Sequence, residues 1–136
     1  MNTLNRAKEL QDRRRQFAVR VIRAFARFPR DEAARIIGRQ FLRSGTSLAA
    51  NYRAACRARS AANFISKISV VTEEADETLF WLELLVDAGV VRRQQADALL
   101  DEANQLVSIF VASLRTAKGL RSAIWNPKSA IAFPPL

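Results

Sequence analysis

The side chains best suited to do chemistry in this sequence are arginines that recur at helical spacing. Eighteen of the 22 basic residues are arginine. A guanidinium group presents several N–H donors in one plane, which suits the oxygens of phosphates and carboxylates. The candidates for contacts with RNA phosphates are Arg13, Arg20, Arg23, Arg27, Arg35, Arg39, Arg43, Arg53 and Arg57.

Charge is spread unevenly along the chain, whose net charge is +9. Residues 1–60 hold fifteen basic and four acidic side chains, whereas residues 61–91 hold one basic and six acidic ones. Such segregation favours a polyanionic partner. The alternative is that the arginines pair with these carboxylates or stay solvated. Six carboxylates cannot neutralise fifteen basic groups. The sequence contains no recognised RNA-binding motif that would decide between a polyanionic partner and paired or solvated arginines.

Several kinds of chemistry are excluded by composition. Histidine is absent and cysteine occurs once, at Cys56, which excludes histidine-based triads, histidine metal sites and zinc–cysteine clusters. A carboxylate-only cation site at Glu73 and Glu77 stays open as an alternative. We expect no enzymatic activity, no cofactor and no metal. Cys56 has two interpretations: nearby arginines lower its pKa, or it is a small core residue.

Apolar residues at 3.6-residue spacing predict four helices. They cover 4–28, a second segment that begins near Asp31, 60–89, and 92–118. Pro29 ends the first, and Ser60 and Gly89 bound the third. Short connections favour antiparallel neighbours. The sequence therefore predicts an all-α fold, an antiparallel up-down-up-down four-helix bundle over 1–119. A non-helical C-terminal tail over 120–136 would dock on the bundle or be partly disordered.

The helix expected from Asp31 has a face of small residues that includes Gly38 and Gly45. Glycine inside a helix costs about 1 kcal/mol relative to alanine, so a packing reason is expected. We predict that a neighbouring helix comes close along this face. A break or kink over 43–46 is the alternative.

Polar residues near the predicted core form another candidate cluster. Ser47 and Asn51 are four residues apart and so are neighbours on one helix. We predict a hydrogen-bonded polar seam that fixes the register of two helices. A functional polar pocket is the alternative. The residues of this seam are Ser44, Ser47, Asn51 and Glu77.

The segment LFWLELLV, which follows Thr78, is apolar nearly all round its helix. Phe80, Trp81 and Leu84 lie opposite the predicted core stripe. A small bundle cannot bury both sides of one helix, so we predict a subunit interface at these three residues. The predicted core stripe is Phe64, Ile68, Val71, Ala75, Leu79, Leu82 and Val86.

No stretch approaches the roughly 18 uninterrupted apolar residues that a membrane span needs. No apolar segment of the signal-peptide type follows the charged N-terminus. A single cysteine suits a reducing compartment. We expect a cytoplasmic protein with no membrane partner.

Two segments, taken in order, resemble a known family. RSGTSLAANYRAA spans 43–55, and FISKISVVTEEADETLFWLELLVDAG spans 64–89. They are similar to the bacterial four-helix-bundle proteins encoded in intervening sequences of large-subunit ribosomal RNA genes. The likeness covers about 15–115. Many members have Glu-Gly shortly after the asparagine, where this chain has Ala54 and Ala55. The residues that match are Arg43, Ser44, Ser47, Asn51, Phe64, Glu77, Leu79 and Leu82.

The resemblance implies a four-helix subunit that assembles into a ring-like homopentamer. It also implies a relation to the accessory protein that works beside the reverse transcriptase of diversity-generating retroelements, with a basic surface for RNA. No enzymatic activity is established for the family. We therefore predict a non-enzymatic basic homo-oligomer that binds structured RNA, or a reverse transcriptase–RNA complex, through the first two helices. The alternative is a protein-interaction scaffold with an acidic partner.

Overall fold

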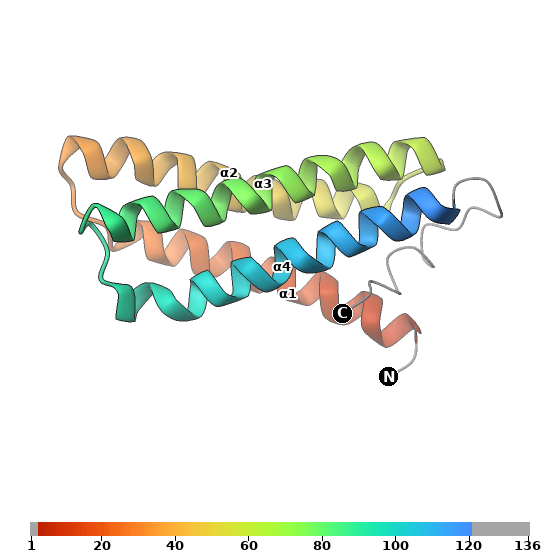
Figure 1. Cartoon of the computed structure of the whole chain (residues 1–136), viewed down its shortest axis with the longest axis horizontal. Helices are drawn as coiled ribbons and strands as arrows, with labels where there is room; N and C mark the ends of the chain where they lie inside the picture. The colour runs from red at the N-terminus through yellow and green to blue at the C-terminus, as the bar shows by residue number, and fades with distance from the viewer. Residues whose placement is uncertain (1–2, 121–136) are drawn as a thin grey trace.

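The computed structural model describes residues 3–120, which form four helices joined by short turns. α1 spans Thr3–Ala26, α2 spans Glu32–Cys56, α3 spans Ala61–Asp87 and α4 spans Arg93–Leu120. The predicted all-α four-helix bundle is confirmed (Figure 1). The predicted tail, from residue 121 onward, lies outside the described residues. None of the four helices is long and apolar enough to cross a membrane.

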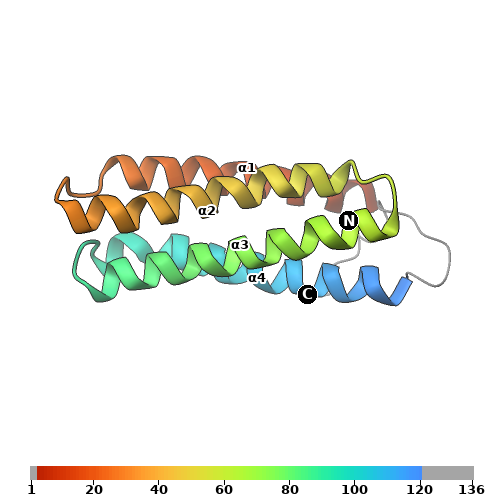
Figure 2. The ribbon, with the colours of Figure 1, turned by 90° about the horizontal axis from the view of Figure 1, so that it is seen from above.

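Each helix packs mainly against its neighbours in sequence (Figures 1 and 2). α2 and α3 share the most extensive interface, α1 packs on α2, and α4 packs on α3. α1 and α4 touch only sparsely. The α1–α2 and α3–α4 turns lie at one end of the bundle, and the α2–α3 turn lies at the other (Figure 2). The start of α2 therefore lies at the same end of the bundle as the last turns of α3.

Local signals place the helix ends near their predicted positions. The side chain of Ser60 accepts a hydrogen bond from the backbone N–H of Asn63 at 3.0 Å, which caps the amino end of α3. Gly89 has a φ of 77°, a left-handed conformation that glycine adopts without strain and that follows the carboxyl end of α3. Asp31 precedes α2 with extended backbone, although its side chain makes no capping hydrogen bond.

The buried stripe of α3 follows a heptad pattern. Its steps alternate between four and three residues, so the stripe keeps facing its neighbours along the whole helix. Leu79 and Val86, which were predicted for this stripe, are only partly buried. The prediction went wrong because a polar residue interrupts the apolar pattern at Thr78. The buried residues are Phe64, Ile68, Val71, Ala75, Thr78, Leu82 and Leu85.

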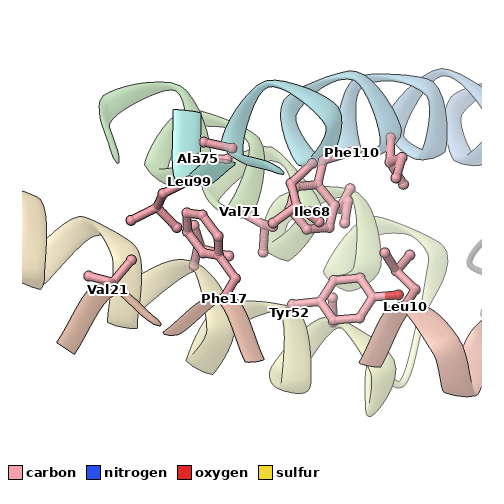
Figure 3. Close-up of a cluster of buried hydrophobic side chains, with 14 of the residues drawn as sticks. Leu10, Phe17, Val21, Tyr52, Ile68, Val71, Ala75, Leu99 and Phe110 are labelled. Atoms are coloured by element: carbon pink, nitrogen blue, oxygen red, sulfur yellow. The ribbon is translucent and has the colours of Figure 1, made fainter. Parts of the chain in front are cut away.

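α1 and α4 close the core around this stripe (Figure 3). Phe17 and Val21 of α1 are buried, as are Leu99 and Phe110 of α4. The Phe110 ring lies 5.4 Å, centroid to centroid, from the ring of Tyr52 on α2. Residues from all four helices thus meet in one continuous core.

The small face of α2 lies against α1, which confirms the predicted close approach. A Cβ added to Gly45 would lie 2.7 Å from Cγ1 of Val21, closer than side chains tolerate. A Cβ added to Gly38 would lie 3.0 Å from ring atoms of both Phe25 and Phe28. Because α2 is continuous from Glu32 to Cys56, the glycines serve packing and the alternative of a break is wrong.

Candidate nucleic-acid interface

Two adjacent arginines in the middle of α1 reach different neighbours. Arg13 reaches α4, where its Nη2 lies 2.7 Å from Oε1 of Glu102 and also donates to Gln105. Arg14 reaches α2, where its Nη1 donates to the carbonyl oxygen of Ala49 at 3.2 Å. These contacts show how α1 is rotated in the bundle: its Arg13 edge faces α4 and its Arg14 edge faces α2.

The Arg13 edge holds part of the arginine row predicted on α1. Arg20 follows Arg13 by seven residues, so it shares its edge on the α4 side, and Arg27 lies in the turn that follows α1. Both are exposed, and so is Arg23 between them. A hydrogen bond to Glu102 raises the pKa of Arg13. The predicted α1 row therefore begins at the edge of α1 that faces α4 rather than α2.

Arg43 of α2 is paired with α3. Its Nη2 lies 2.9 Å from a carboxylate oxygen of Glu77, and its Nη1 lies 3.3 Å from one of Glu74. The hydrogen bond to Glu77 raises the pKa of Arg43. Within residues 3–120, Arg13 and Arg43 are the predicted phosphate contacts that form ion pairs with carboxylates. The pairing alternative thus accounts for two of the nine arginines.

A second set of arginines borders the interface between α1 and α2. Arg15 and Arg53 both stand close enough to Arg14 to lower its pKa, although burial has the larger effect. Arg57 stands close enough to the Cys56 thiol to act on its pKa. Cations from both helices therefore meet here.

The set continues toward the α1–α2 turn. Arg35 lines a pocket there together with Phe25 and Phe28 of α1. Arg39 lies two heptads before Arg53 and so shares its edge of α2. None of these arginines forms an ion pair with a carboxylate of the described residues. We name the set the α1–α2 ridge; its members are Arg14, Arg15, Arg35, Arg39, Arg53 and Arg57.

Arg14 was missed in the sequence and is the most unusual member of the ridge. Its exposed fraction is 9%, and its Cζ lies 5.8 Å from the centroid of the Tyr52 ring. Nε of Arg14 is buried without a hydrogen-bond partner, and the hydroxyl of Tyr52 is buried beside the thiol of Cys56. Burial lowers the pKa of Arg14 and raises that of Tyr52 well above its ordinary value. Arg14 lies four residues after Leu10 and three before Phe17, which are both buried. This spacing in the sequence indicates that Arg14 shares their buried face.

Cys56 lies beside this buried group. Its Sγ accepts a hydrogen bond from Nε2 of Gln11 at 3.7 Å. Burial raises the pKa of the Cys56 thiol and outweighs the lowering effects of Tyr52 and Arg14. The interpretation as a reactive, low-pKa cysteine is therefore wrong, and Cys56 packs against the core.

The predicted polar seam is present in part, with different partners. Ser44 is buried and its hydroxyl lies 2.9 Å from that of Thr78 on α3, in a hydrogen bond donated by Thr78. Asn51 donates to the hydroxyl of Ser47 at 3.1 Å, within α2. Glu77 does not join the seam, because its carboxylate is paired with Arg43. Thr78 thus takes the place predicted for Glu77.

The residues predicted for a subunit interface lie on the outer side of α3. Phe80 is 52% exposed and Leu84 36%, while Trp81 is half-buried with its ring 4.9 Å from that of Phe80. Ile36 of α2 is also 51% exposed. Ile36 lies seven residues before Arg43 on α2, and Leu84 lies seven residues after Glu77 on α3. Residues seven apart share one face of a helix, so the pairing of Arg43 with Glu77 places Ile36 and Leu84 on the same face of the bundle. We name Ile36, Phe80, Trp81 and Leu84 the apolar patch.

Comparison with known proteins identifies the family. A family model described as 23S rRNA-intervening sequence protein matches residues 7–112. The chain belongs to this family. The resemblance inferred from the two sequence motifs is therefore confirmed, and the residues matched include the α1–α2 ridge and the apolar patch.

A solved structure is also similar to this member of the intervening-sequence family. It is the crystal structure of a protein with unknown function from the S23 ribosomal protein family of Bacteroides thetaiotaomicron. The two chains are 32% identical, with a TM-score of 0.73 over 78% of this chain and 98% of that chain. None of the curated proteins compared matches the sequence.

Proposed function

We propose that this family member is a non-enzymatic homo-oligomer that binds structured RNA, alone or in a complex with a reverse transcriptase, through the α1–α2 ridge. The proposal rests on one observation, a set of arginines along one helix interface that have no carboxylate partner in residues 3–120. Phosphate oxygens supply the missing negative charge, and planar guanidinium donors bind them at more than one point. No group of the ridge suggests a chemical step.

The ridge refines the set of arginines predicted from the sequence. Arg35, Arg39, Arg53 and Arg57 belong to both sets. The ridge adds Arg14 and Arg15 and omits Arg13 and Arg43, which are ion-paired. Arg20 and Arg23 line a hollow with the ridge member Arg15, and Arg27 lies in the turn after α1. These three exposed cations contribute to the general field around the ridge.

A salt titration of binding tests the proposal. The protein would be titrated against a structured RNA, a DNA duplex of equal length and a flexible polyanion over a range of salt concentrations. We expect tightest binding to the RNA, with affinity that falls steeply as salt rises. Equal and weak binding to all three polymers would show generic charge and would favour the alternative of a scaffold for an acidic protein.

Two matched variants locate the surface. Arg53→Gln/Arg57→Gln removes two ridge cations, and Arg20→Gln/Arg27→Gln removes the same charge from α1 and the turn that follows it. We expect the ridge variant to weaken RNA binding and to reduce the salt slope by roughly 2. We expect the control variant to change both quantities less. Equal effects of the two variants would contradict a localised ridge.

The homo-oligomer part of the proposal rests on the apolar patch. A monomer gains nothing from exposing an isoleucine, a phenylalanine and a leucine together, whereas a second subunit would cover them. The resemblance to the family suggests five subunits. Light scattering on the protein and on Phe80→Ser/Leu84→Ser tests this part: we expect a wild-type oligomer that dissociates in the variant. A monomeric wild type would overturn it.

A further inference from the structure

A small pocket lies at the α1–α2 turn, where the ridge ends. It has a volume of about 220 Å³, below the roughly 300–1,000 Å³ of pockets for drug-sized ligands. It is therefore sized for one flat group rather than a large molecule. Residues from the end of α1, the turn and the first turn of α2 line it; they are Phe25, Ala26, Phe28, Pro29, Arg30 and Arg35.

The aromatic wall of the pocket is held in place from behind. The rings of Phe25 and Phe28 meet edge to face with centroids 6.0 Å apart, and Phe28 also lies 5.7 Å from the buried ring of Phe41. Both rings occupy the space that a side chain at position 38 would need, because a Cβ on Gly38 would lie 3.0 Å from each. Gly38 thus lets two half-buried rings lie close to α2 with part of their surface open to the pocket.

The rim of the pocket is cationic. Arg30 and Arg35 line it, and neither forms an ion pair within residues 3–120. Asp31 and Glu32 lie between them in sequence and are exposed, but they are not part of the lining. Arg35 is also the ridge arginine nearest the pocket, so a backbone that follows the ridge leads to it.

We propose that this turn pocket receives one unpaired nucleobase of the bound RNA, while Arg30 and Arg35 hold its phosphate. This inference rests on the RNA-binding function proposed above and adds a preference for unpaired nucleotides. A nucleobase is flat and stacks on aromatic rings, and its attached phosphate matches the two guanidinium groups. A base inside a duplex cannot enter, because both of its faces are already stacked.

Competition between two RNAs tests the proposal. One is a hairpin with an unpaired uridine loop, and the other is a blunt duplex with the same stem and no unpaired nucleotide. We expect the wild type to bind the hairpin about tenfold more tightly. We expect Phe25→Leu, which keeps an apolar side chain but removes the ring, to lose this preference while still binding the duplex.

The control is Phe64→Leu, which makes the same change at a buried ring of α3 outside the pocket, the ridge and the apolar patch, and it should keep the preference. Equal binding of hairpin and duplex by the wild type would overturn the turn pocket and leave RNA binding by the ridge intact. A preference that survives in Phe25→Leu would also overturn it. No binding to either RNA would overturn the proposed function itself.

If Phe25→Leu fails to fold, photo-cross-linking of RNA to the wild-type protein provides a second test. The hairpin would carry 5-iodouridine in its loop, and the wild-type protein would be irradiated and mapped by mass spectrometry. We expect cross-links at Phe25 or Phe28. Cross-links confined to other parts of the protein would overturn the proposal.

Discussion

The two interfaces of α2 are built differently, although one helix supplies both. Toward α1, glycines let the backbones come close, as at Gly45 against Val21. Toward α3, polar groups find partners, as in the Ser44–Thr78 hydrogen bond and the pairing of Arg43 with carboxylates. The α3 side therefore neutralises its cation, while the α1 side leaves its cations without carboxylate partners in the described chain.

This difference explains why charge is available for binding on one side of α2. The acidic residues of the third quarter of the chain are on α3, so they reach the α3 side of α2 and not the α1 side. α1 is itself basic and offers its neighbour cations such as Arg14 and Arg15. Like charges beside one another reduce stability, and a polyanion relieves that cost.

The largest effect is expected from filling the glycine contact. Gly45→Val places a branched side chain where even a Cβ would lie 2.7 Å from Val21. Overpacking of a tight interface costs about 3 kcal/mol when the neighbour cannot move away. Urea denaturation followed by circular dichroism measures the change.

Gly119→Val is the matched control, because nothing lies within 4 Å of a Cβ at Gly119. Its effect should stay within about 0.5 kcal/mol. A small effect of Gly45→Val would show that α1 and α2 are not closely packed there.

A smaller effect is expected at alkaline pH from the buried phenol of Tyr52. Burial raises its pKa in the folded state, so its contribution to stability is complete below the ordinary pKa of about 10 and is lost as pH rises above it. The loss reaches about 1.4 kcal/mol per pH unit. Tyr52 is the single tyrosine of the chain, so its phenolate absorbance can be followed directly. We expect phenolate to appear together with loss of helix.

Tyr52→Phe is the control for the alkaline loss. The variant should lose less stability above pH ~10, and the raised pKa of the Cys56 thiol accounts for part of what remains. Because the polar neighbour of the hydroxyl is the Cys56 thiol, a weak hydrogen-bond partner, removing the hydroxyl should cost less than about 1 kcal/mol at neutral pH. Phenolate that forms in a fully helical protein would contradict the burial of this group.

The smallest effect on stability is expected from removing exposed charges. Removal should destabilise the protein on the α3 side of α2 and should be neutral or stabilising on the α1 side. Arg43→Gln removes two ion pairs of a half-exposed side chain, so it should destabilise by about 0.5 kcal/mol, and less at high salt. Arg53→Gln removes repulsion from Arg14 and should leave stability unchanged or raise it. Thermal unfolding measures both changes. Equal destabilisation by the two variants would contradict the difference between the α1 and α3 sides of α2.

Much of the fold could be predicted from the sequence because its signals are local. Pro29, Ser60 and Gly89 mark helix ends by their own backbone chemistry, and apolar spacing gives the core face of each helix. Gly45 indicated a close neighbour, which the structure identifies as α1. The failure at Thr78 came from treating a polar residue as a break in the stripe, when its hydroxyl is bonded to Ser44.

The candidate site could be predicted only in part because it depends on how helices are rotated. Arg13 and Arg14 are adjacent and chemically identical, yet one faces α4 and the other α2. Nothing in the spacing of a single helix says which neighbour stands at which edge. The arginines of α2 were found because they lie on its outer side, whereas Arg14 was hidden in the apolar stripe. That any of them contact RNA remains a prediction.

The sparse contact between α1 and α4 has a consequence for how the chain folds. Most native contacts join helices that follow one another in sequence, so the loops that must close are short and folding should be rapid. The Arg13–Glu102 pair spans nearly the whole bundle in sequence. We expect it to form after the rate-limiting step, so its removal should speed unfolding and leave the folding rate nearly unchanged.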